Sequence, residues 1–480
     1  MRNLLVILLV LTSISLALAE EVKVPGLRLL YRLSLEDVSF YVRAGHQPDA
    51  FLTFSPDEKF LAVGTFLGRL LLLKAQTGEI LWEKHIPEGM VKRIAFSPDG
   101  RTIYYGEQSP DGFIYAADQD TGEIKWSFRL ADDLFSGEPP EKGDVYGIYR
   151  QPGCYRLKVL ANGDLLVLGL HSWYDRRQEV WRRLSRLYRL APEGKLVWAW
   201  PKEGPAKLTL IFADADRSGR VVATVALNPS EDIPKDYSFS PNTLYILDGK
   251  NGQERWRYQI PPLKPYYDRV SVWESVRVSP EGHYALVGTA DGRAFIVDLM
   301  RKRVRIIALG APIKISGFPV AAMINYGYAL KDTFYFLTGT SSLPYSLPMA
   351  IDRPAGPHPQ ANTLFALRPC GQIKWRFTAD FRLQGIEADQ EGRIVAVAVG
   401  GSRRSLRKTR QFGVFVFDTR RPGGGLEKLV GYFPTEGPCF FHLAVSPQGH
   451  LVALVETPYL TEEERLVGRY QILVLKLLER

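Results

Sequence analysis

The chain is a succession of similar segments, and this internal repeat constrains its fold more than any other feature. Each segment holds a short apolar run, a turn rich in Ser, Pro, Asp, Asn and Gly, and a second apolar run, as in FLTFSPDEKFLAVG at 51–64. Equivalent turns recur 42 to 65 residues apart, at Ser55, Ser97, Asn162, Ser218, Ser279, Asp332, Glu391 and Ser446. Two apolar runs around such a turn predict a β-hairpin. Regular recurrence of the hairpin indicates a repeat architecture.

A second unit follows many of these hairpins and ends in tryptophan. It consists of an apolar strand, a turn containing Gly and another strand, as in IYAADQDTGEIKW at 114–126. Five of the nine tryptophans occupy the final position of this unit: Trp82, Trp126, Trp198, Trp256 and Trp375. Together the two units predict four antiparallel strands per repeat, with almost no helical periodicity.

Four-stranded sheets can bury both of their faces when they are arrayed around an axis. We therefore predict an all-β fold, an eight-bladed β-propeller of four-stranded antiparallel blades. Seven blades is the alternative, because the repeat at 312–338 is the weakest. The last repeat supplies three strands, and GLRLLYRLSL at 26–35 is a suitable fourth. We expect this N-terminal strand to pair with the C-terminal blade and to close the ring.

The first residues have the composition of a secretory signal. Arg2 precedes an apolar run, and Ala17 and Ala19 stand at the small-residue positions of a cleavage site. The apolar run is shorter than the roughly 20 residues of a membrane span. We predict a signal peptide at 1–19 and a single β-propeller domain at 20–480. The mature protein is expected to be periplasmic or extracellular, soluble, monomeric and without a transmembrane span.

Composition narrows the classes further. The chain has 46% hydrophobic and 24% charged residues, as globular proteins do. A formal charge of +9 over 480 residues is a mild excess and does not predict nucleic acid as a partner. Cys154, Cys370 and Cys439 allow at most one disulfide, with three partly buried thiols as the alternative.

The string Ala-x-Asp-x-x-Thr-Gly-x-x-x-Trp, complete from Ala116 to Trp126, resembles the docking motif of pyrroloquinoline-quinone-type propeller repeats. The SPDG turns resemble those of WD-repeat-like propellers. The resemblance covers nearly all of the mature chain and implies that each Trp wedges against the next blade, with a Gly turn beneath it. The matching pairs are Gly78 and Trp82, Gly122 and Trp126, Gly194 and Trp198, Gly252 and Trp256, and Gly371 and Trp375. The repeats at Asp298 and Asp418 lack the pattern.

The same resemblance raises the question of a quinone cofactor. Quinoprotein dehydrogenases of this shape resemble one another in an adjacent cysteine pair and a calcium-binding acidic cluster near the axis. This chain has no Cys-Cys dipeptide and no acidic cluster at calcium-loop spacing. It also lacks metal-pair histidines and a nucleophile elbow. We predict no cofactor, no metal and no catalytic residue; enzymatic activity stays an open question, and a non-catalytic protein is favoured.

Insertions between the second and third strands of several repeats are candidate binding sites. Two of them are basic, and the first also carries Trp181 and Tyr174. The candidate residues are Trp173, Arg176, Arg177, Arg182, Arg183 and Arg186 in one, and Arg403, Arg404, Arg407, Lys408 and Arg410 in the other. Arginine and aromatic residues are enriched at binding hot spots, and a positive patch attracts acidic partners. A solvated loop without a partner is the alternative interpretation.

Three functions follow from these features. The first is an exported, non-catalytic propeller that acts as a scaffold for an envelope or secreted protein partner. The second is a quinone- or metal-dependent oxidoreductase of the quinoprotein type. The third is a binder of an anionic surface polymer, which would use the basic insertions.

Overall fold

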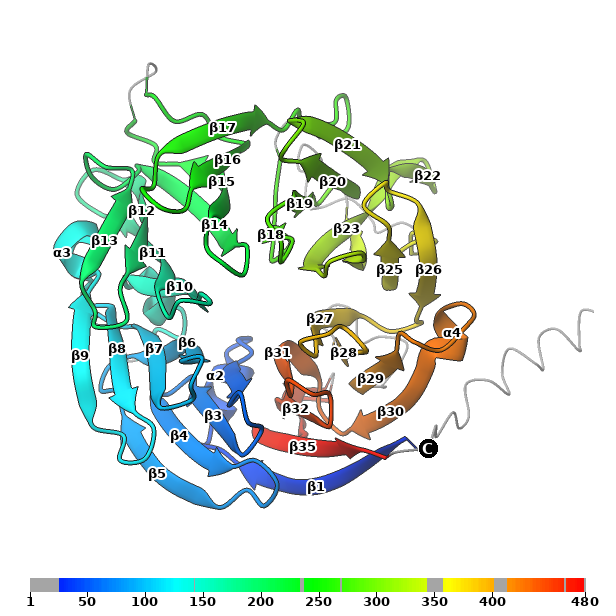
Figure 1. The fold of residues 1–480 in the computed structure, drawn as a ribbon, viewed down its shortest axis with the longest axis horizontal. Helices are drawn as coiled ribbons and strands as arrows, with labels where there is room; N and C mark the ends of the chain where they lie inside the picture. The colour runs from blue at the N-terminus through cyan, green and yellow to red at the C-terminus, as the bar shows by residue number, and fades with distance from the viewer. Residues whose placement is uncertain are drawn as a thin grey trace, which may run out of the picture.

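A computed structural model gives the fold of the chain (Figure 1). It describes residues 26–478 apart from 142, 234–236, 268–269, 343–356, 401–411 and 462. The predicted signal peptide at 1–19 lies outside the described residues. The described chain is all-β, and its antiparallel sheets surround a central axis in the manner of propeller blades (Figure 1). Most of them have four strands, and the pairing of Gly153 with Gln108 joins two four-stranded units, 90–129 and 153–200, into one continuous sheet.

Within each sheet, strands succeed one another from the axis outwards, except that the last sheet takes its outermost strand from the start of the chain. The innermost strands are β2 (Ala50–Phe54), β6 (Met90–Phe96), β10 (Gly153–Val159), β14 (Leu208–Ala215), β18 (Arg277–Val278), β23 (Phe318–Ala329), β27 (Leu383–Ala388) and β31 (Cys439–Val445). The second strands are β3 (Phe60–Thr65), β7 (Thr102–Gln108), β11 (Leu165–Asp175), β15 (Val221–Pro229), β19 (Tyr284–Gly288), β24 (Phe334–Ser342), β28 (Ile394–Val399) and β32 (Leu451–Glu456).

The third and outermost strands complete the sheets. The third strands are β4 (Arg69–Lys74), β8 (Phe113–Asp118), β12 (Val180–Leu190), β16 (Thr243–Asp248), β20 (Arg293–Asp298), β25 (Thr363–Leu367), β29 (Phe412–Asp418) and β35 (Gln471–Leu477). The outermost are β5 (Ile80–His85), β9 (Ile124–Arg129), β13 (Leu196–Trp200), β17 (Glu254–Gln259), β21 (Arg303–Ala308), β26 (Ile373–Thr378), β30 (Leu429–Thr435) and β1 (Leu27–Ser34). β22 (Ile313–Ile315) extends the sheet of β23, and β33 (Tyr459–Leu460) pairs with β34 (Leu466–Val467).

The first described strand pairs with the last. β1 runs antiparallel to β35, with Leu27 opposite Leu477 and Ser34 opposite Gln471. The same sheet continues through β32 to β31, so three of its strands come from the end of the chain. Leu35 extends the pairing, because its backbone N–H donates to the carbonyl of Tyr470 at 2.9 Å.

The core lies between neighbouring sheets. Middle strands are covered on both faces, and accordingly every residue of β28 is buried, whereas the outer strand β5 is mostly exposed. Between β11 and β14, for example, Leu166 and Leu168 pack in one cluster with Leu208 and Leu210. Each sheet therefore depends on its neighbours for burial of its apolar side chains.

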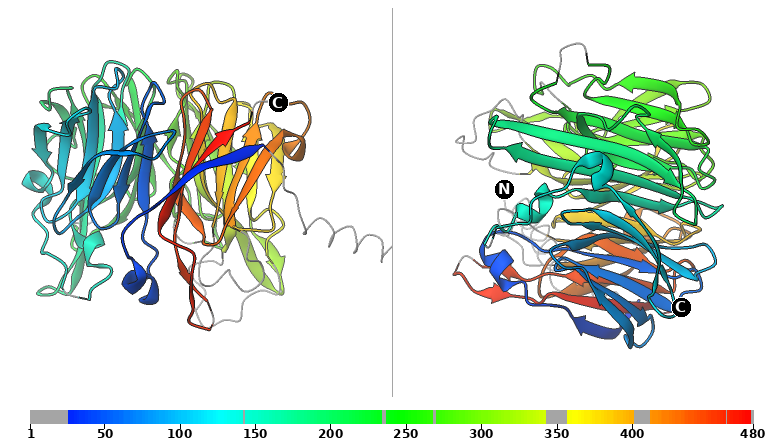
Figure 2. Two further views of the ribbon diagram at one scale, coloured as in Figure 1. Left: turned by 90° about the horizontal axis from the view of Figure 1, so that it is seen from below. Right: turned by 90° about the vertical axis from the view of Figure 1, so that its left-hand side faces the viewer.

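The two faces of the disk differ in their connections (Figure 2). On one face, first and second strands join through short turns with a repeated hydrogen-bond network. Ser55 Oγ donates to Asp57 and accepts from the N–H of Phe60, as Ser97 does with Asp99 and Thr102.

Helices are few and short in the described residues: they are α2 (Ser39–Arg43), α3 (Ala131–Leu134), η1 (Gly147–Arg150) and α4 (Gly425–Lys428).

The opposite face, which we call the loop face, carries the long connections. It bears α2, the connection 130–152, the end of the β11–β12 hairpin and the β33–β34 hairpin, which project from the same side of the disk (Figure 2). None of the helices in the described part of the chain is long and apolar enough to span a bilayer.

Candidate functional site

Tryptophans predicted to dock the blades join neighbouring sheets at their outer edges. The indole N–H donates to a carbonyl of the next sheet in three cases: Trp82 to Gln119 (2.8 Å), Trp126 to Pro192 (2.8 Å) and Trp198 to Gly249 (2.7 Å). A buried indole N–H needs an acceptor, since an unpaired buried donor is costly. These three contacts link the sheets that end in β5, β9 and β13 to the sheets that follow them.

The predicted pairing of each Trp with the Gly of its own turn is wrong, because the glycine beneath each of these indoles belongs to the following repeat. Gly122 lies under Trp82, Gly194 under Trp126 and Gly252 under Trp198. Their φ angles are +71°, +86° and +72°, and a Cβ would come within 2.6 to 3.0 Å of the ring. Glycine is required at these positions both by the left-handed backbone and by the close approach of the ring.

Other side chains replace the indole where a preceding repeat has no tryptophan. Gly78 faces the ring of Tyr31 on β1. Gly371 faces Arg305 and Ile307, which lie on the outer strand of the repeat that has lost the pattern. The glycine turn is therefore present in these repeats too, although the side chain that packs on it is not a tryptophan. The remaining two predicted docking residues pack on aromatic rings: Trp256 on Tyr258, and Trp375 on Tyr335 and Phe417.

The first basic insertion, expected as a loop, is instead an extension of the β11–β12 hairpin. Trp173 pairs with Arg182 and Asp175 with Val180 in an unbroken register. Alternating side chains let a strand pair continue beyond the body of the blade, so Arg182 and Arg183 belong to β12. Only the turn around Arg177 is free of strand structure.

Several of the predicted basic residues are bound to neighbouring groups. Arg182 pairs with Asp175 at 2.9 Å and with Asp232. Arg186 pairs with Asp133 at 2.8 Å and donates to two carbonyls. These two guanidinium groups hold the hairpin to the connections on either side.

The remaining residues of this insertion are more accessible. Arg176 makes a 3.5 Å pair with Glu141, and both side chains are more than 70% exposed. Arg183 donates to the carbonyl of Pro229 and lies over the ring of Trp181. Trp173 stacks on His171, with ring centroids 4.2 Å apart. The second set, Arg403, Arg404, Arg407, Lys408 and Arg410, lies outside the described residues.

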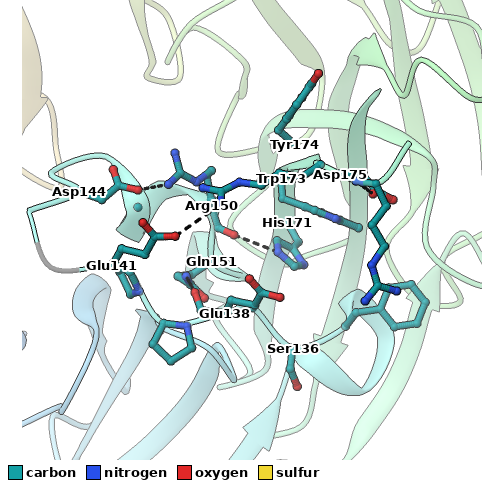
Figure 3. A pocket seen from close by; sticks show the side chains of 17 residues that line it. Ser136, Glu138, Glu141, Asp144, Arg150, Gln151, His171, Trp173, Tyr174 and Asp175 are labelled. Atoms are coloured by element: carbon teal, nitrogen blue, oxygen red, sulfur yellow. Dashed lines mark hydrogen bonds and ion pairs between the residues drawn. The ribbon is translucent and has the colours of Figure 1, made fainter. Parts of the chain in front are cut away.

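Beside the hairpin, the loop face contains a pocket of about 520 Å³ (Figure 3). Its walls come from the connection 135–151 and from 171–177 of the hairpin. Arg150 is paired with Asp144, and Figure 3 shows Glu141 and Glu138 on the same wall. The pocket thus has a mixed-charge lining with Trp173 on one side.

His171 fastens this pocket to the blade. Its Nδ1 lies 2.7 Å from the carbonyl oxygen of Leu134, and its Nε2 lies 3.0 Å from that of Arg150. Burial lowers the pKa of His171, while the two carbonyls act in the opposite direction. Because one ring contacts both ends of the connection, it fixes the floor of the pocket.

A second polar region lines the axis, on the innermost strands. Most of these strands carry a β-bulge against the second strand of their blade, at Val91–Arg93, Cys154–Arg156, Ile211–Asp214, Ala322–Tyr326, Leu383–Ile386 and Cys439–Leu443. A bulge interrupts strict alternation and re-aims the side chains beside it. Charged residues consequently face the axis from strands whose neighbours are apolar.

One buried network in this channel centres on Asp214. Its carboxylate accepts from Lys158 at 2.8 Å, from Arg156 at 3.1 Å and from the N–H of Val278 at 2.9 Å. Burial alone would raise the pKa of Asp214, but Lys158 and Arg156 hold it well below its usual value. The network joins three successive blades, because its members come from β10, β14 and β18.

A second pair crosses the channel. Arg93 on β6 contacts Glu274 at 3.3 Å, and its guanidinium lies 4.5 Å from the ring centroid of Phe51. His442 stacks on the same ring and pairs with Asp49 at 3.1 Å. Arg93 and Glu274 keep 13% and 21% of their side-chain surface exposed, so they border a narrow accessible space.

Lys92 occupies a different environment at the loop-face end of the channel. Its side chain is only 8% exposed, and Nζ lies 5.0 Å and 4.8 Å from the ring centroids of Tyr149 and Tyr155. Burial and the neighbouring Arg93 lower its pKa to about 7. Across the channel, burial raises the pKa of Glu387 to about 7.

The sequence reasoning did not find this channel. Arg93, Arg156 and Glu274 match no motif. The sequence signal that could have identified them is their position. Each lies at or beside the first strand of a repeat, where a charged residue interrupts a run of apolar residues. The three cysteines are free thiols in the structure, with Cys154 and Cys439 buried and Cys370 exposed.

The channel residues do not fit a calcium-bound quinone. Asp214 and Glu274, which could supply oxygen ligands, already contact cationic side chains that would repel a metal ion. Within the described ranges, no group of three His, Cys, Asp or Glu side chains is placed to hold a metal. Cys154 and Cys439 are on different blades and cannot supply an adjacent pair.

Comparison with known proteins agrees with the fold. The family model described as outer membrane protein assembly factor BamB matches residues 39–140. Methanol dehydrogenase [cytochrome c] subunit 1 of Paracoccus denitrificans is 30% identical over 137 residues, which are 27% of this chain and 21% of the relative. Polyvinylalcohol dehydrogenase of Sphingopyxis sp. (strain 113P3) is 23% identical over 325 residues, 56% of this chain and 46% of the relative. The chain spans less than half the length of these two curated relatives.

Solved structures are similar over nearly the whole chain. BamB from Moraxella catarrhalis covers 94% of this chain and is itself covered completely, with a TM-score of 0.50 and 11% identity. Quinohemoprotein alcohol dehydrogenase ADHIIG from Pseudomonas putida HK5 covers 95% of this chain, with 77% of its own length matched, a TM-score of 0.55 and 11% identity. The protein is therefore a β-propeller. Its repeats are of the pyrroloquinoline-quinone-like type, as the family match and the dehydrogenase relatives both indicate.

Proposed function

We propose that this protein is an exported, non-catalytic propeller that binds a protein partner through its loop face. After a signal peptide at 1–19, residues 20–480 form one domain of eight blades, closed by the pairing of β1 with the C-terminal sheet. The mature protein works in the periplasm or outside the cell. The match to BamB, which is described as an assembly factor, supports a scaffold role.

The strand arrangement supports eight blades rather than seven. Eight innermost and eight outermost strands are described, and the weak repeat contributes a complete set from β23 to β26. Closure is supported by the antiparallel register of β1 and β35, which extends from Leu27 to Ser34. Propellers need such an overlap of their ends because an open ring would leave two unpaired sheet faces.

The observation that carries the partner-binding role is the exposure of aromatic side chains on the loop face. Phe135 is 63% exposed, Tyr146 50%, Tyr174 42% and Trp181 38%. They surround the pocket beside the β11–β12 hairpin or lie close to it in the chain. Large exposed aromatics next to arginine are typical of protein-binding hot spots.

The charges around these aromatics favour a protein over an anionic polymer. Arg182 and Arg186 are neutralised by Asp175 and Asp133, and Arg176 faces Glu141. A polyanion is bound best by a continuous run of cations, whereas a polypeptide can match alternating charges. The described part of the loop face has the alternating pattern.

The oxidoreductase alternative is supported by the two dehydrogenase relatives. Under this alternative, the protein purified from the cells that produce it should show the absorbance of a bound quinone or should reduce an artificial electron acceptor. The scaffold proposal predicts neither. A quinone spectrum that disappears when the channel residue Arg156 is changed would decide for the alternative.

A site-specific photo-crosslinker tests the scaffold proposal. We expect the crosslinker at Trp181 to form adducts with a protein that can be identified by mass spectrometry. The purified partner should then bind the propeller, and Tyr174→Ala with Trp181→Ala should weaken its Kd by about 100-fold, as loss of two hot-spot aromatics would do.

Leu426 provides the matched control, because it is 65% exposed on α4 at the outer edge. A crosslinker or an alanine there should leave capture and Kd unchanged. Equal adduct yields at Trp181 and Leu426, or an unchanged Kd in the double variant, would contradict the proposal.

A further inference from the structure

Lys92 is a buried amine that makes no direct ion pair within the described part of the chain. It lies on β6 within the bulge between Val91 and Arg93, where the backbone register with β7 shifts. Among the described residues, no carboxylate lies within ion-pair distance of Nζ and no hydrogen bond is made by it. Buried lysines are almost always paired, so an unpaired ammonium here is unusual.

Lys158, on the next blade, shows what a paired channel lysine looks like. Its Nζ lies 2.8 Å from Asp214 and also donates to the carbonyl of Ala215. Nζ of Lys92 instead lies over the faces of Tyr149 and Tyr155, at 5.0 Å and 4.8 Å, and no described carboxylate is in direct contact with it. The two rings attract a cation but accept no proton and form no ion pair. The two lysines therefore differ in pairing although both are enclosed by the same channel.

This environment favours the neutral, nucleophilic form of the amine. Burial disfavours the ammonium, and the adjacent guanidinium of Arg93 disfavours it further, whereas the carboxylates of Asp49 and Glu274 act in the opposite direction and are outweighed. The pKa of Lys92 is accordingly lowered to about 7. Amines activated in this way by desolvation and a neighbouring cation are those that attack carbonyl groups.

The Lys92 site adjoins the pocket on the loop face. Gln108 donates from Nε2 to Tyr155 Oη at 3.0 Å and to the carbonyl of Gln151 at 3.1 Å. Gln151 lines the pocket wall, and Arg150, in the same wall, follows Tyr149 in η1. The Oε1 atoms of Gln108 and Gln151 are buried without a partner among the described residues, so this region between Tyr155 and the pocket has unused hydrogen-bond acceptors.

We propose that Lys92 is a carbonyl-reactive site, which takes a small aldehyde or ketone as a Schiff base at the loop-face end of the channel. The neutral Nζ adds to the carbonyl carbon and forms the C–N bond. The carbonyl oxygen then leaves as water with the two amine protons, and an imine remains. The step is a condensation and needs no oxidant or reductant. It is independent of the protein-binding role.

Reductive labelling tests this assignment on the full-length folded protein. Propanal and sodium cyanoborohydride are added at pH 7, and propylated lysines are quantified by peptide mass spectrometry over time. Lys92 should be labelled at least about tenfold faster than the exposed Lys302, because a large fraction of the Lys92 amine is neutral at pH 7 and only a neutral amine adds to the carbonyl. Its rate should rise to half-maximum near pH 7.

Lys158 is the internal control, since its pairing with Asp214 should keep it slow under the same conditions. Lys92→Met should lose the fast label while the labelling of all other lysines stays the same, which also shows that the variant is folded. Labelling of Lys92 that is no faster than that of Lys302, or that increases only near pH 10, would overturn the proposal.

Discussion

The outer seams and the central channel hold the same blades together by opposite means. At the seams, an indole lies on a glycine of the next repeat and donates one hydrogen bond, as Trp198 does over Gly252. In the channel, charged side chains from different blades meet, as Asp214 does with Arg156. The tryptophan contact is neutral and repeated, whereas the channel is charged and its residues vary from blade to blade.

This difference shows which parts of the ring are architectural. A contact that stabilises every blade in the same way can recur in each repeat, and tryptophan does recur at one position in five of the repeats. Channel positions have no such uniformity: Arg93, Asp214 and Tyr326 all follow bulges on innermost strands. Paired charges bordering an accessible space add less stability than apolar packing would, which indicates that the channel serves a purpose besides stability.

The largest expected effect is at a fully developed seam. Trp198→Ala removes a 7% exposed indole between two sheets and should cost about 3–5 kcal/mol, because its cavity cannot collapse between rigid blades. Trp126→Ala should cost less, since that ring is only partly buried. Urea unfolding followed by fluorescence of the remaining tryptophans measures both. Equal losses of stability in the two variants would show that burial of the indole does not determine how much this contact between neighbouring sheets stabilises the fold.

In the channel, Asp214→Ala should destabilise the fold by about 3 kcal/mol. The substitution leaves Lys158 and Arg156 without their carboxylate, and removing one partner of an enclosed ion pair costs more than the pair itself contributes. Thermal unfolding at pH 7 provides the measurement. If Asp214→Ala unfolds at the same temperature as the parent protein, water in the channel screens these charges and the network does not stabilise the fold.

Lys92→Met should stabilise the protein at low pH, by about 1–2 kcal/mol near pH 6. The folded pKa is about 7 and the ordinary value is 10.5, so the unfolded chain holds more protons between these limits. Parent stability therefore rises with pH across that range, and the advantage of the variant shrinks. Unfolding midpoints from pH 6 to 9 test this; an advantage that is constant with pH would contradict the lowered pKa.

The smallest effect is expected on the exposed outer surface. Arg69 and Glu83 form a 2.6 Å pair between outer strands, with 25% and 39% of their side chains exposed. Glu83→Ala should change stability by less than about 1 kcal/mol, as for other surface pairs. Melting in low and high salt measures it, and a change as large as that of Asp214→Ala would remove the distinction between surface and channel charge.

Much of the fold could be predicted because its signals are local. Serine–proline–aspartate turns fix the hairpins through contacts between residues two to five positions apart, such as those of Ser97. The tryptophan–glycine string likewise lies within thirteen residues of sequence. The insertion after His171 was also found, although its form was not: the turn chemistry that would have ended strand β11 earlier is absent, so the hairpin extends to Asp175.

By itself, the sequence determined the repeat, the four strands in each unit and the place of the tryptophans, because hydrophobic periodicity and turn chemistry act over short distances. Only the tertiary structure decided which charges face the axis. Bulges on the inner strands interrupt the alternation of side chains that would otherwise predict which residues point to the axis. The pairing of Arg93 with Glu274 joins residues that are far apart in the chain. Such a contact exists only after the sheets have assembled around their common axis, since no local pattern specifies it.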